Sequence, residues 1–446
     1  MPSKEHRDNL QKLFTRDKHG VVVLRGASIL HRYGTDYEFP FRQESNFWYL
    51  TGVDEPDYEM VLNLGNGNFH LIAPDRDSDF AVWNGRIVPP AEIRERYQPD
   101  HLHIGQEMEE VLREIDPDVI YTVPSDLADE LEDDLPDHTI DTESLTDALA
   151  WCRAIKNEDE LGRLRHAAEI NNQAHLEVLQ NLRPGLYEYE CKALFEYHQI
   201  RNGLVQDAYN GIHASGPNSA ILHYTGTNRK LRNGDLYLID AGHEYLGYAS
   251  DFSRTWPVNG RYTDWQKVIC EIVLEAQKAA IREATPGTRM EELHLLSAKI
   301  ITDGLLDAGL LRGNRKELME KDLFALFFPH GLGHFLGLDT HDVGGYPKGV
   351  TRIDRPGLRH LRVRRELEPG MVITVEPGIY FIPALLLPAL DNPEKAPYLN
   401  RERIERLLDF GGIRIEDNLI ITEQSPENLT RLPKEITDIE EVMSRS

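Results

Sequence analysis

Cysteine is scarce in this sequence, since Cys152, Cys191 and Cys270 are the three present in 446 residues. Their number is odd and they lie far apart, which argues against a disulfide framework and against a zinc site built on thiolates. Long apolar runs are also missing, and the most apolar stretch, 381–390, is short and contains two prolines. A bilayer-spanning helix needs roughly 20 apolar residues, and residues 1–14 lack an apolar signal core. We therefore expect a cytoplasmic protein without a membrane partner.

Basic residues are outnumbered by acidic ones. The chain has 49 Lys and Arg against 75 Asp and Glu, which gives a formal net charge of −26. A surface of this sign repels phosphate groups, so nucleic acid and anionic membranes are disfavoured as partners. The hydrophobic fraction of 40% and the charged fraction of 28% are ordinary for a globular protein with sizeable cores.

The length of the chain corresponds to two or three domains. Residues 1–155 mix short strand-like segments with helical ones, which predicts an α/β domain with its own sheet. Residues 156–446 open with a long helical pattern that Asn157 and Glu160 can cap. Runs of strands and pairs of helices then follow without regular alternation, which predicts an α+β domain. Its further helices are predicted over 187–202, 262–284 and 289–310.

Acidic residues interrupt four apolar strands that the sequence predicts in the second domain. The strands and their carboxylates are 236–240 with Asp240, 248–256 with Asp251, 371–380 with Glu376 and 412–422 with Glu416. Asp240 and Asp251 are close enough in the chain to lie together on a hairpin. One acidic residue on a strand usually faces solvent, but a buried carboxylate is costly unless a cation pairs with it. Four such residues favour a shared site.

The stretch HGLGHFLGLDTHD at 330–342 holds three histidines, two aspartates and three glycines. His330 and His334 have the spacing of a helical metal site. However, each glycine costs a helix about 1 kcal/mol relative to alanine, so a helix is not expected here. Any one of these histidines alone would also fit an ordinary surface or core position.

Converging carboxylates would need cations between them, because like charges repel strongly when buried. Two divalent ions and a shared hydroxide leave little net charge on four carboxylates, whereas a single ion leaves a surplus of negative charge. An oxygen-rich ligand set with one imidazole suits Mn²⁺ or Co²⁺, and Zn²⁺ also fits. Two such metals about 3.5–4 Å apart can lower the pKa of a shared water and polarise a carbonyl group. The chemistry implied is metal-assisted hydrolysis.

The order of these motifs resembles that of the pita-bread metallopeptidases, which include prolidases, aminopeptidase P and methionine aminopeptidases. The matching elements are Asp240 and Asp251, then HGLGH, VEPG and RIED. The resemblance implies that 156–446 forms a pita-bread catalytic domain in which 330–342 is an irregular strand and turn.

The resemblance extends to the first domain. The segments FRQESNFWYLTGVDEP (41–56) and AVWNGR (81–86) are similar to the creatinase-type N-terminal domain that prolidases share with aminopeptidase P. Methionine aminopeptidases lack this domain, so they match less well. In the second domain, VEPGIYFIPALLLPAL and HDVGGYPKGVTRIDRPGLRHLR resemble the prolidases of the animal type.

Metal-binding and catalytic roles follow from the resemblance. Two divalent ions per chain would be held by Asp240, Asp251, His334, Glu376 and Glu416. Asp240 would hold one ion, His334 with Glu376 the other, and Asp251 and Glu416 would bridge them. Glu376 would also move the proton of the attacking water. His330 and His341 would stabilise the tetrahedral oxygen or position the leaving group.

The resemblance also assigns substrate contacts. Arg362 would bind the free carboxylate of a C-terminal proline, as paired guanidinium hydrogen bonds allow. His223 would approach the same group. The remaining assignments are Tyr209 and Ile212 in the pocket wall and Trp83 as a contact to a neighbouring subunit in a homodimer. Arg414 precedes Glu416 by two positions, so on a strand both side chains face the same side, and we expect Arg414 to orient Glu416. Other arginines of the same segment would fit the surface equally well: Arg352, Arg355, Arg359, Arg364 and Arg365.

These observations predict a dinuclear-metal peptidase that cleaves Xaa-Pro dipeptides before a free C-terminal proline. Aminopeptidase P activity on longer peptides is the nearest alternative, because the chemistry is the same. An alternative of another class is a non-catalytic pita-bread protein that binds peptides.

Overall fold

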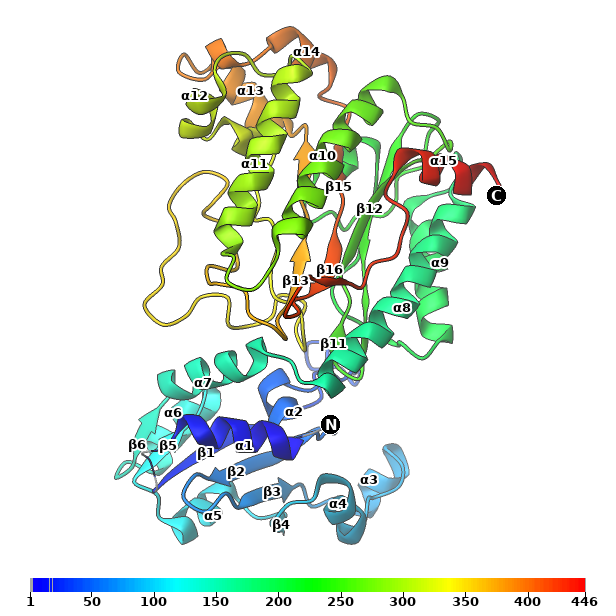
Figure 1. The fold of residues 1–446 in the computed structure, drawn as a ribbon. Helices are drawn as coiled ribbons and strands as arrows, with labels where there is room; N and C mark the ends of the chain where they lie inside the picture. Colours follow the sequence, from blue (N-terminus) through cyan, green and yellow to red (C-terminus); the bar gives the residue numbers. More distant parts are fainter. Residues whose placement is uncertain (1–2, 16, 18, 446) are drawn as a thin grey trace. The chain divides into compact units, whose positions relative to one another are not determined.

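The computed structural model describes residues 3–15, 17 and 19–445, and the chain divides into two compact units, Met1–Arg153 and Ala154–Ser446. Figure 1 shows both units coloured along the sequence. Within the described residues, no helix has both the length and the apolar character needed to cross a membrane.

The N-terminal unit is built on one sheet of six strands in the order β4-β3-β2-β1-β5-β6. Its strands are β1 (Gly20–Arg25), β2 (Glu59–Asn63), β3 (Phe69–Ala73), β4 (His101–Ile104), β5 (Val119–Tyr121) and β6 (Thr139–Asp141). Its helices are α1 (Ser3–Leu13), α2 (Ser45–Thr51), α3 (Ser78–Trp83), α4 (Pro90–Tyr97), α5 (Met108–Ile115), α6 (Asp126–Asp134) and α7 (Glu143–Ala154). The sheet contains parallel and antiparallel strand pairs, and helices follow most of its strands along the chain, so the predicted α/β class is confirmed.

The C-terminal unit combines small antiparallel sheets with two pairs of long helices. Its helices are α8 (Glu158–Asn181), α9 (Glu188–Arg201), α10 (Asp264–Glu283), α11 (Met290–Asp307), α12 (Arg315–Glu320), α13 (Pro383–Asp391), α14 (Arg401–Arg406) and α15 (Ile436–Ser444). Its strands are β7 (Gln206–Asp207), β8 (Ile212–Ser215), β9 (Leu236–Ala241), β10 (His243–Tyr245), β11 (Tyr248–Ala249), β12 (Phe252–Pro257), β13 (Val372–Val375), β14 (Gly378–Tyr380), β15 (Gly412–Arg414), β16 (Asp417–Ile420) and β17 (Glu427–Asn428). The predicted α+β class is confirmed.

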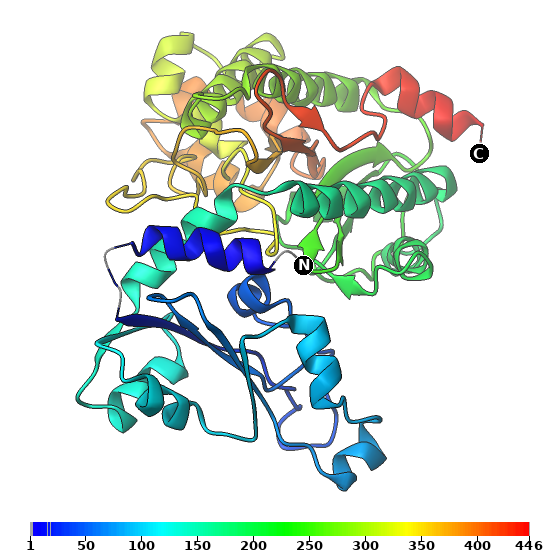
Figure 2. The ribbon, with the colours of Figure 1, turned by 60° about the horizontal axis from the view of Figure 1, so that its bottom comes forward.

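The long helices begin where the sequence predicts. The Asn157 side chain accepts from the Glu160 amide and the Glu160 side chain from the Asn157 amide, so the predicted cap of α8 is a reciprocal capping box. The other three predicted helices correspond to α9, α10 and α11. Figures 1 and 2 show α8 beside α9 and α10 beside α11. The first pair packs on β8, β10 and β11, and α10 packs on β13, β14 and β15.

Three predicted strands are each broken in two, and the break falls at an acidic residue. Asp251 follows β11, Glu376 follows β13, and Glu416 follows β15. The prediction that these carboxylates lie inside continuous strands is therefore wrong. The physical reason lies in the backbone, because the amide of each acidic residue at a break donates a hydrogen bond to another segment. The Glu376 amide bonds Leu332 O at 2.8 Å and the Glu416 amide bonds Ser253 O at 3.0 Å.

A histidine without polar partners lies in the core of the C-terminal unit. His294 on α11 is fully buried, and its ring lies over that of Phe328 with 5.0 Å between centroids. Neither ring nitrogen has a hydrogen-bond partner within the described residues. Burial lowers the pKa of His294 from 6.5 to about 3, so the imidazole is neutral in the folded protein at ordinary pH.

Replacing His294 should therefore stabilise the protein, and more so in acid. Below about pH 6 the unfolded chain protonates this histidine and the folded chain does not, so wild-type stability falls with pH. The free energy of unfolding of His294→Leu should exceed that of the wild type, by about 2 kcal/mol more at pH 5 than at pH 7. Urea unfolding of both proteins at the two pH values measures this difference, and an equal difference at both would contradict the assignment.

Candidate active site

One cavity of about 800 Å³ in the C-terminal unit brings together twelve of the thirteen side chains that the sequence singles out. They are Tyr209, Ile212, His223, Asp240, Asp251, His330, His334, His341, Arg362, Glu376, Arg414 and Glu416. Trp83 is the exception, since it ends α3 in the N-terminal unit, where its side chain is 84% exposed. The cleft therefore gathers segments that are more than 200 residues apart in the chain.

The first two carboxylates lie on the predicted hairpin. β9 and β12 pair antiparallel with Asp240 opposite Ser253, and Asp251 directly precedes β12. The Tyr209 hydroxyl lies 2.7 Å from Asp240 Oδ1 and 2.6 Å from Asp251 Oδ1. A phenol has one proton to donate, so these two carboxylates share it. Burial and the two aspartates raise the pKa of Tyr209 well above its usual value.

His334 and Glu376 lie side by side because the glycine-rich stretch runs along β13. The Thr374 amide donates to His334 O at 2.9 Å, and Phe335 bridges to Ile373. A Cβ at Gly333 would lie 2.0 Å from Thr374 O, so only glycine permits this approach. As expected from the sequence, 330–342 forms an irregular extended segment and no helix.

The orientation of His334 leaves one nitrogen for the cluster. Its Nδ1 donates to Phe335 O at 2.9 Å, so Nε2 faces the carboxylates. Nε2 lies 3.3 Å from Asp251 Oδ2 and 3.7 Å from Glu376 Oε1. The ligand atoms of Asp251, His334 and Glu416 all lie within 4.8 Å of one another. This is the compactness that a metal site needs.

Glu416 is held by β12. Ser253 Oγ donates to Glu416 Oε2 at 2.7 Å, and Arg254 Nη1 donates to Glu416 O at 2.7 Å. The orientation of Glu416 by Arg414 stays a prediction, and Ser253 Oγ lies between the two side chains. The Arg414 guanidinium pairs with Asp240, and its Nε donates to Ser253 Oγ at 2.8 Å. Its influence on Glu416 passes through this serine.

The pKa shifts of the buried carboxylates indicate which kind of ligand the cluster can bind. Burial raises the pKa of Glu376 to about 7, and burial together with Asp251 and Glu376 raises that of Glu416 well above its usual value. Burial is the largest influence on the pKa of Asp251 and acts to raise it, but the hydrogen bond and charge of His334, the Tyr209 hydrogen bond and His341 together leave the pKa lowered. Divalent cations would remove the repulsion that drives these upward shifts. The residues present therefore fit divalent metal ions.

His330 is held beside this cluster by neutral hydrogen bonds. Its Nδ1 donates to Gly331 O at 2.7 Å, and its Nε2 lies 3.0 Å from the Tyr380 hydroxyl. Arg414 Nη1 donates to the same hydroxyl at 2.7 Å, so the Tyr380 hydroxyl in turn donates its hydrogen bond to His330 Nε2. Burial lowers the pKa of His330 to about 3, which keeps the imidazole neutral.

A wall formed by His341, His223 and Arg362 adjoins the carboxylates. The ring of His341 lies edge-on to His334 with 4.5 Å between centroids. Desolvation lowers the pKa of His341, and the neighbouring His334, Arg362 and His223 lower it further, which shows that these groups are close. His223 and Arg362 are exposed to the cleft.

Sequence reasoning missed Glu188, which holds the loop that carries His223. This buried carboxylate accepts five hydrogen bonds. The donors are Ser215 N and Oγ at 2.7 Å each, Asn218 Nδ2 at 3.1 Å, Tyr224 OH at 2.8 Å and Arg229 N at 3.0 Å. No local motif signals this role, because Glu188 simply occupies the first turn of α9, where acidic residues are common. Tyr380 and Ser253 were also missed, because their partners His330 and Glu416 lie far away in the chain.

The substitution Glu188→Gln should loosen this loop without touching the carboxylate cluster. A glutamine brings two N–H groups of its own and leaves donors unsatisfied, at about 1–3 kcal/mol each. We expect KM for peptide substrates to rise roughly 10-fold while kcat and metal content change little. Steady-state kinetics measure both, with Glu196→Gln on the same helix as the control. A fall in kcat at unchanged KM would contradict this role.

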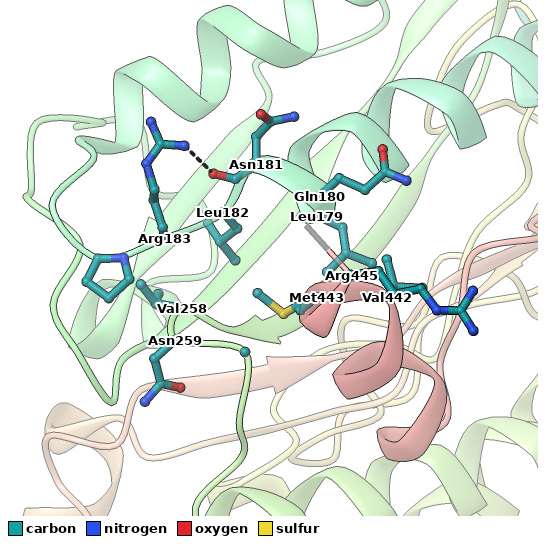
Figure 3. A pocket seen from close by; sticks show the side chains of 12 residues that line it. Leu179, Gln180, Asn181, Leu182, Arg183, Val258, Asn259, Val442, Met443 and Arg445 are labelled. Carbon is teal, nitrogen blue, oxygen red and sulfur yellow. Dashed lines mark hydrogen bonds between the residues drawn. The ribbon is translucent and has the colours of Figure 1, made fainter.

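A second cavity lacks the groups that hydrolysis needs. It has a volume of about 790 Å³ and lies between the end of α8, the turn after β12 and α15. In Figure 3, Leu182, Val258 and Met443 lie toward its middle, and Arg183 and Arg445 extend away. Among the described residues, no histidine, cysteine or carboxylate lines this cavity. The cleft around Glu376 is therefore the candidate active site.

A buried cluster of carboxylates and a histidine in an open cleft defines a metal-dependent hydrolase. The chain belongs to metallopeptidase family M24, whose family model matches residues 162–423. The model described as aminopeptidase P, N-terminal domain, matches residues 4–121. Together with the Asp251, His334 and Glu416 group, membership of this family implies divalent metal ions. The predicted family and the hydrolase class are confirmed.

Relatives named Xaa-Pro dipeptidase and relatives named Xaa-Pro aminopeptidase both resemble the chain over nearly its whole length. The Xaa-Pro dipeptidase of Homo sapiens is 39% identical over 436 residues, which cover 95% of this chain and 88% of that protein. The probable Xaa-Pro aminopeptidase pepP of Botryotinia fuckeliana (strain B05.10) is 36% identical, with 100% and 97% covered. The solved structure of proline aminopeptidase P II from Yersinia pestis has a TM-score of 0.88 and 32% identity, and all of both chains is covered.

Proposed function

We propose that this protein is an Xaa-Pro dipeptidase that hydrolyses the bond before a free C-terminal proline. The observation that carries the proposal is the guanidinium of Arg362, which is exposed in the same cleft as the carboxylate cluster and has no ion pair or hydrogen bond among the described residues. A dipeptide ends in a carboxylate immediately after the proline ring, and a longer peptide does not.

Arg362 differs from the other arginines of its segment, because those arginines already have partners within the protein. Each of the other five arginines in this segment has an ion pair or hydrogen bond: Arg352 with Leu361 O, Arg355 with Asp322, Arg359 with Asp354, Arg364 with Glu291 and Arg365 with Glu368. Within the described part of the chain, Arg362 forms neither kind of contact. A guanidinium without a partner, beside His223 and His341, suits a carboxylate that arrives with the substrate.

We further propose that the metal ions are two, and that they are Mn²⁺ in preference to Co²⁺ or Zn²⁺, because four of the five ligands are carboxylates. Asp240 would hold one ion, His334 and Glu376 the other, with Asp251 and Glu416 between them. Such a pair lowers the pKa of a water and polarises the peptide carbonyl.

The other steps belong to side chains of this protein. Arg362, with His223, binds the substrate carboxylate and so fixes where the scissile bond lies. Glu376 accepts the proton of the attacking water and returns it to the departing proline nitrogen. His341, on the wall beside His334, donates a hydrogen bond to the oxygen that gains negative charge. Tyr380 and Arg414 hold His330 against Glu376, at 3.8 Å between Nδ1 and Oε2.

The substitution Arg362→Ala tests the preference for dipeptides. Loss of a charge-assisted pair costs about 1.5–3 kcal/mol, so kcat/KM for Gly-Pro should fall by roughly 10- to 100-fold. A tripeptide Xaa-Pro-Xaa should lose far less, because its carboxylate lies one residue further on. The control is Arg359→Ala, which removes a surface arginine of the same segment. Equal losses on both substrates, or a wild-type preference for the tripeptide, would favour the aminopeptidase alternative.

Metal content and thermal unfolding test the ligand set independently of activity. Loading the metal-free wild type with Mn²⁺ should raise its unfolding temperature, because an ion that binds the folded state stabilises it. Asp251→Asn should lose most of this rise and bind less metal, whereas Asp307→Asn at the exposed end of α11 should match the wild type. Fewer than about one ion per loaded wild-type chain would favour a non-catalytic binding protein.

Assembly as a homodimer and a cytoplasmic location remain predictions. The exposed Trp83 side chain is available to contact a second copy, as the family resemblance implies. Light scattering of the purified wild type and of Trp83→Ala would measure the mass in solution.

A further inference from the structure

Three histidines gather on one face of the sheet in the N-terminal unit, at its edge. β3 and β4 pair parallel, with His70 opposite His101 and Ile72 opposite His103. Paired residues point to the same side of a sheet, and so do residues two apart on a strand. His70, His101 and His103 therefore share one face, and β4 is the outermost strand.

The rings are in contact and two nitrogens face each other. The His70 and His101 centroids are 4.4 Å apart, and those of His70 and His103 are 5.4 Å apart. His70 Nδ1 lies 3.2 Å from His103 Nε2. Two imidazole nitrogens bound to one tetrahedral Zn²⁺ at about 2.0–2.1 Å lie roughly 3.4 Å apart. The existing spacing is thus close to that of two ligands on one ion.

The surroundings orient the rings as a metal site would. His103 Nδ1 faces Gln106 Oε1 at 2.8 Å, so Nδ1 carries the proton and the Nε2 lone pair accepts a hydrogen bond from His70 Nδ1, a proton that a bound metal would displace. His101 is exposed, and its Nε2 has a single long contact of 3.4 Å with Asn68 Nδ2. Rotation of this side chain can bring a third nitrogen to the pair.

The charge state of the cluster also suits a cation. Burial, together with His101 and His103, lowers the pKa of His70 to about 4, so the ring is in the neutral form that binds metals. Asp100 is the nearby carboxylate, and its Oδ2 already accepts from the Phe69 amide at 2.8 Å. No carboxylate is directly bonded to these three rings in the described part of this unit.

We propose that His70, His101 and His103 form a second metal site that binds one transition-metal ion of the class that imidazole prefers, such as Zn²⁺ or Ni²⁺. An all-nitrogen site discriminates against Mn²⁺, which the carboxylates of the cleft suit better. Occupancy would tie β3 to the edge strand β4 and stabilise the unit, while the chemistry at Glu376 proceeds unchanged.

The experiment compares zinc uptake by full-length proteins whose cleft is first filled with Mn²⁺. The wild type, His101→Ala, His103→Ala and the control His31→Ala are titrated with Zn²⁺ in a calorimeter, and bound metals are counted after desalting. We expect the wild type and His31→Ala to bind about one more zinc ion per chain than the other two. Zinc should raise the unfolding temperature of the first two proteins only, and Gly-Pro hydrolysis by the manganese forms should be equal in all four.

Two results would overturn the proposal. One is equal zinc uptake by the wild type and His103→Ala. The other is unchanged uptake by His101→Ala, which would exclude His101 as a ligand. Because His101 is exposed, its replacement leaves the fold intact, and circular dichroism of the metal-free variants checks this.

Discussion

The mutual repulsion of buried carboxylates is the constraint on which the catalytic unit depends. Asp240, Asp251, Glu376 and Glu416 meet in one cleft, and each must be neutralised there. Arg414 pairs with Asp240 and His334 with Asp251, and the Tyr209 hydroxyl lies between these two aspartates. Glu416 accepts a hydrogen bond from Ser253, which carries no charge. Charge of this density is stable around cations and costly without them. The activity and the stability of the unit are therefore two aspects of one electrostatic balance.

The broken strands show how a sheet accommodates such a site. A continuous strand alternates its side chains between two faces, so it cannot aim one carboxylate freely. At Asp251, Glu376 and Glu416 the ladder stops for one or two residues, and the amides bond to other segments. The glycine-rich stretch completes the arrangement from the other side, since Gly333 allows the backbone of His334 to lie against Thr374.

Much of this architecture could be predicted from the sequence because its signals are local. The capping box of Asn157 and Glu160 and the hairpin of Asp240 and Asp251 depend on residues close in the chain. The carboxylate and histidine motifs likewise indicated which side chains share the cleft. What could not be predicted depends on contacts between distant segments. Arg414 pairs with Asp240, 174 residues away, and Glu416 accepts a hydrogen bond from Ser253, 163 residues away. The two-residue spacing of Arg414 and Glu416 gave no sign of either contact.

The Arg362 guanidinium in the cleft has a consequence for turnover. The carboxylate that Arg362 is proposed to hold stays on proline after the peptide bond breaks, so the anchor of the substrate is also the anchor of one product. Free proline should then leave slowly and compete with fresh dipeptide. The same feature that selects short substrates would thus slow the enzyme by product inhibition when proline accumulates.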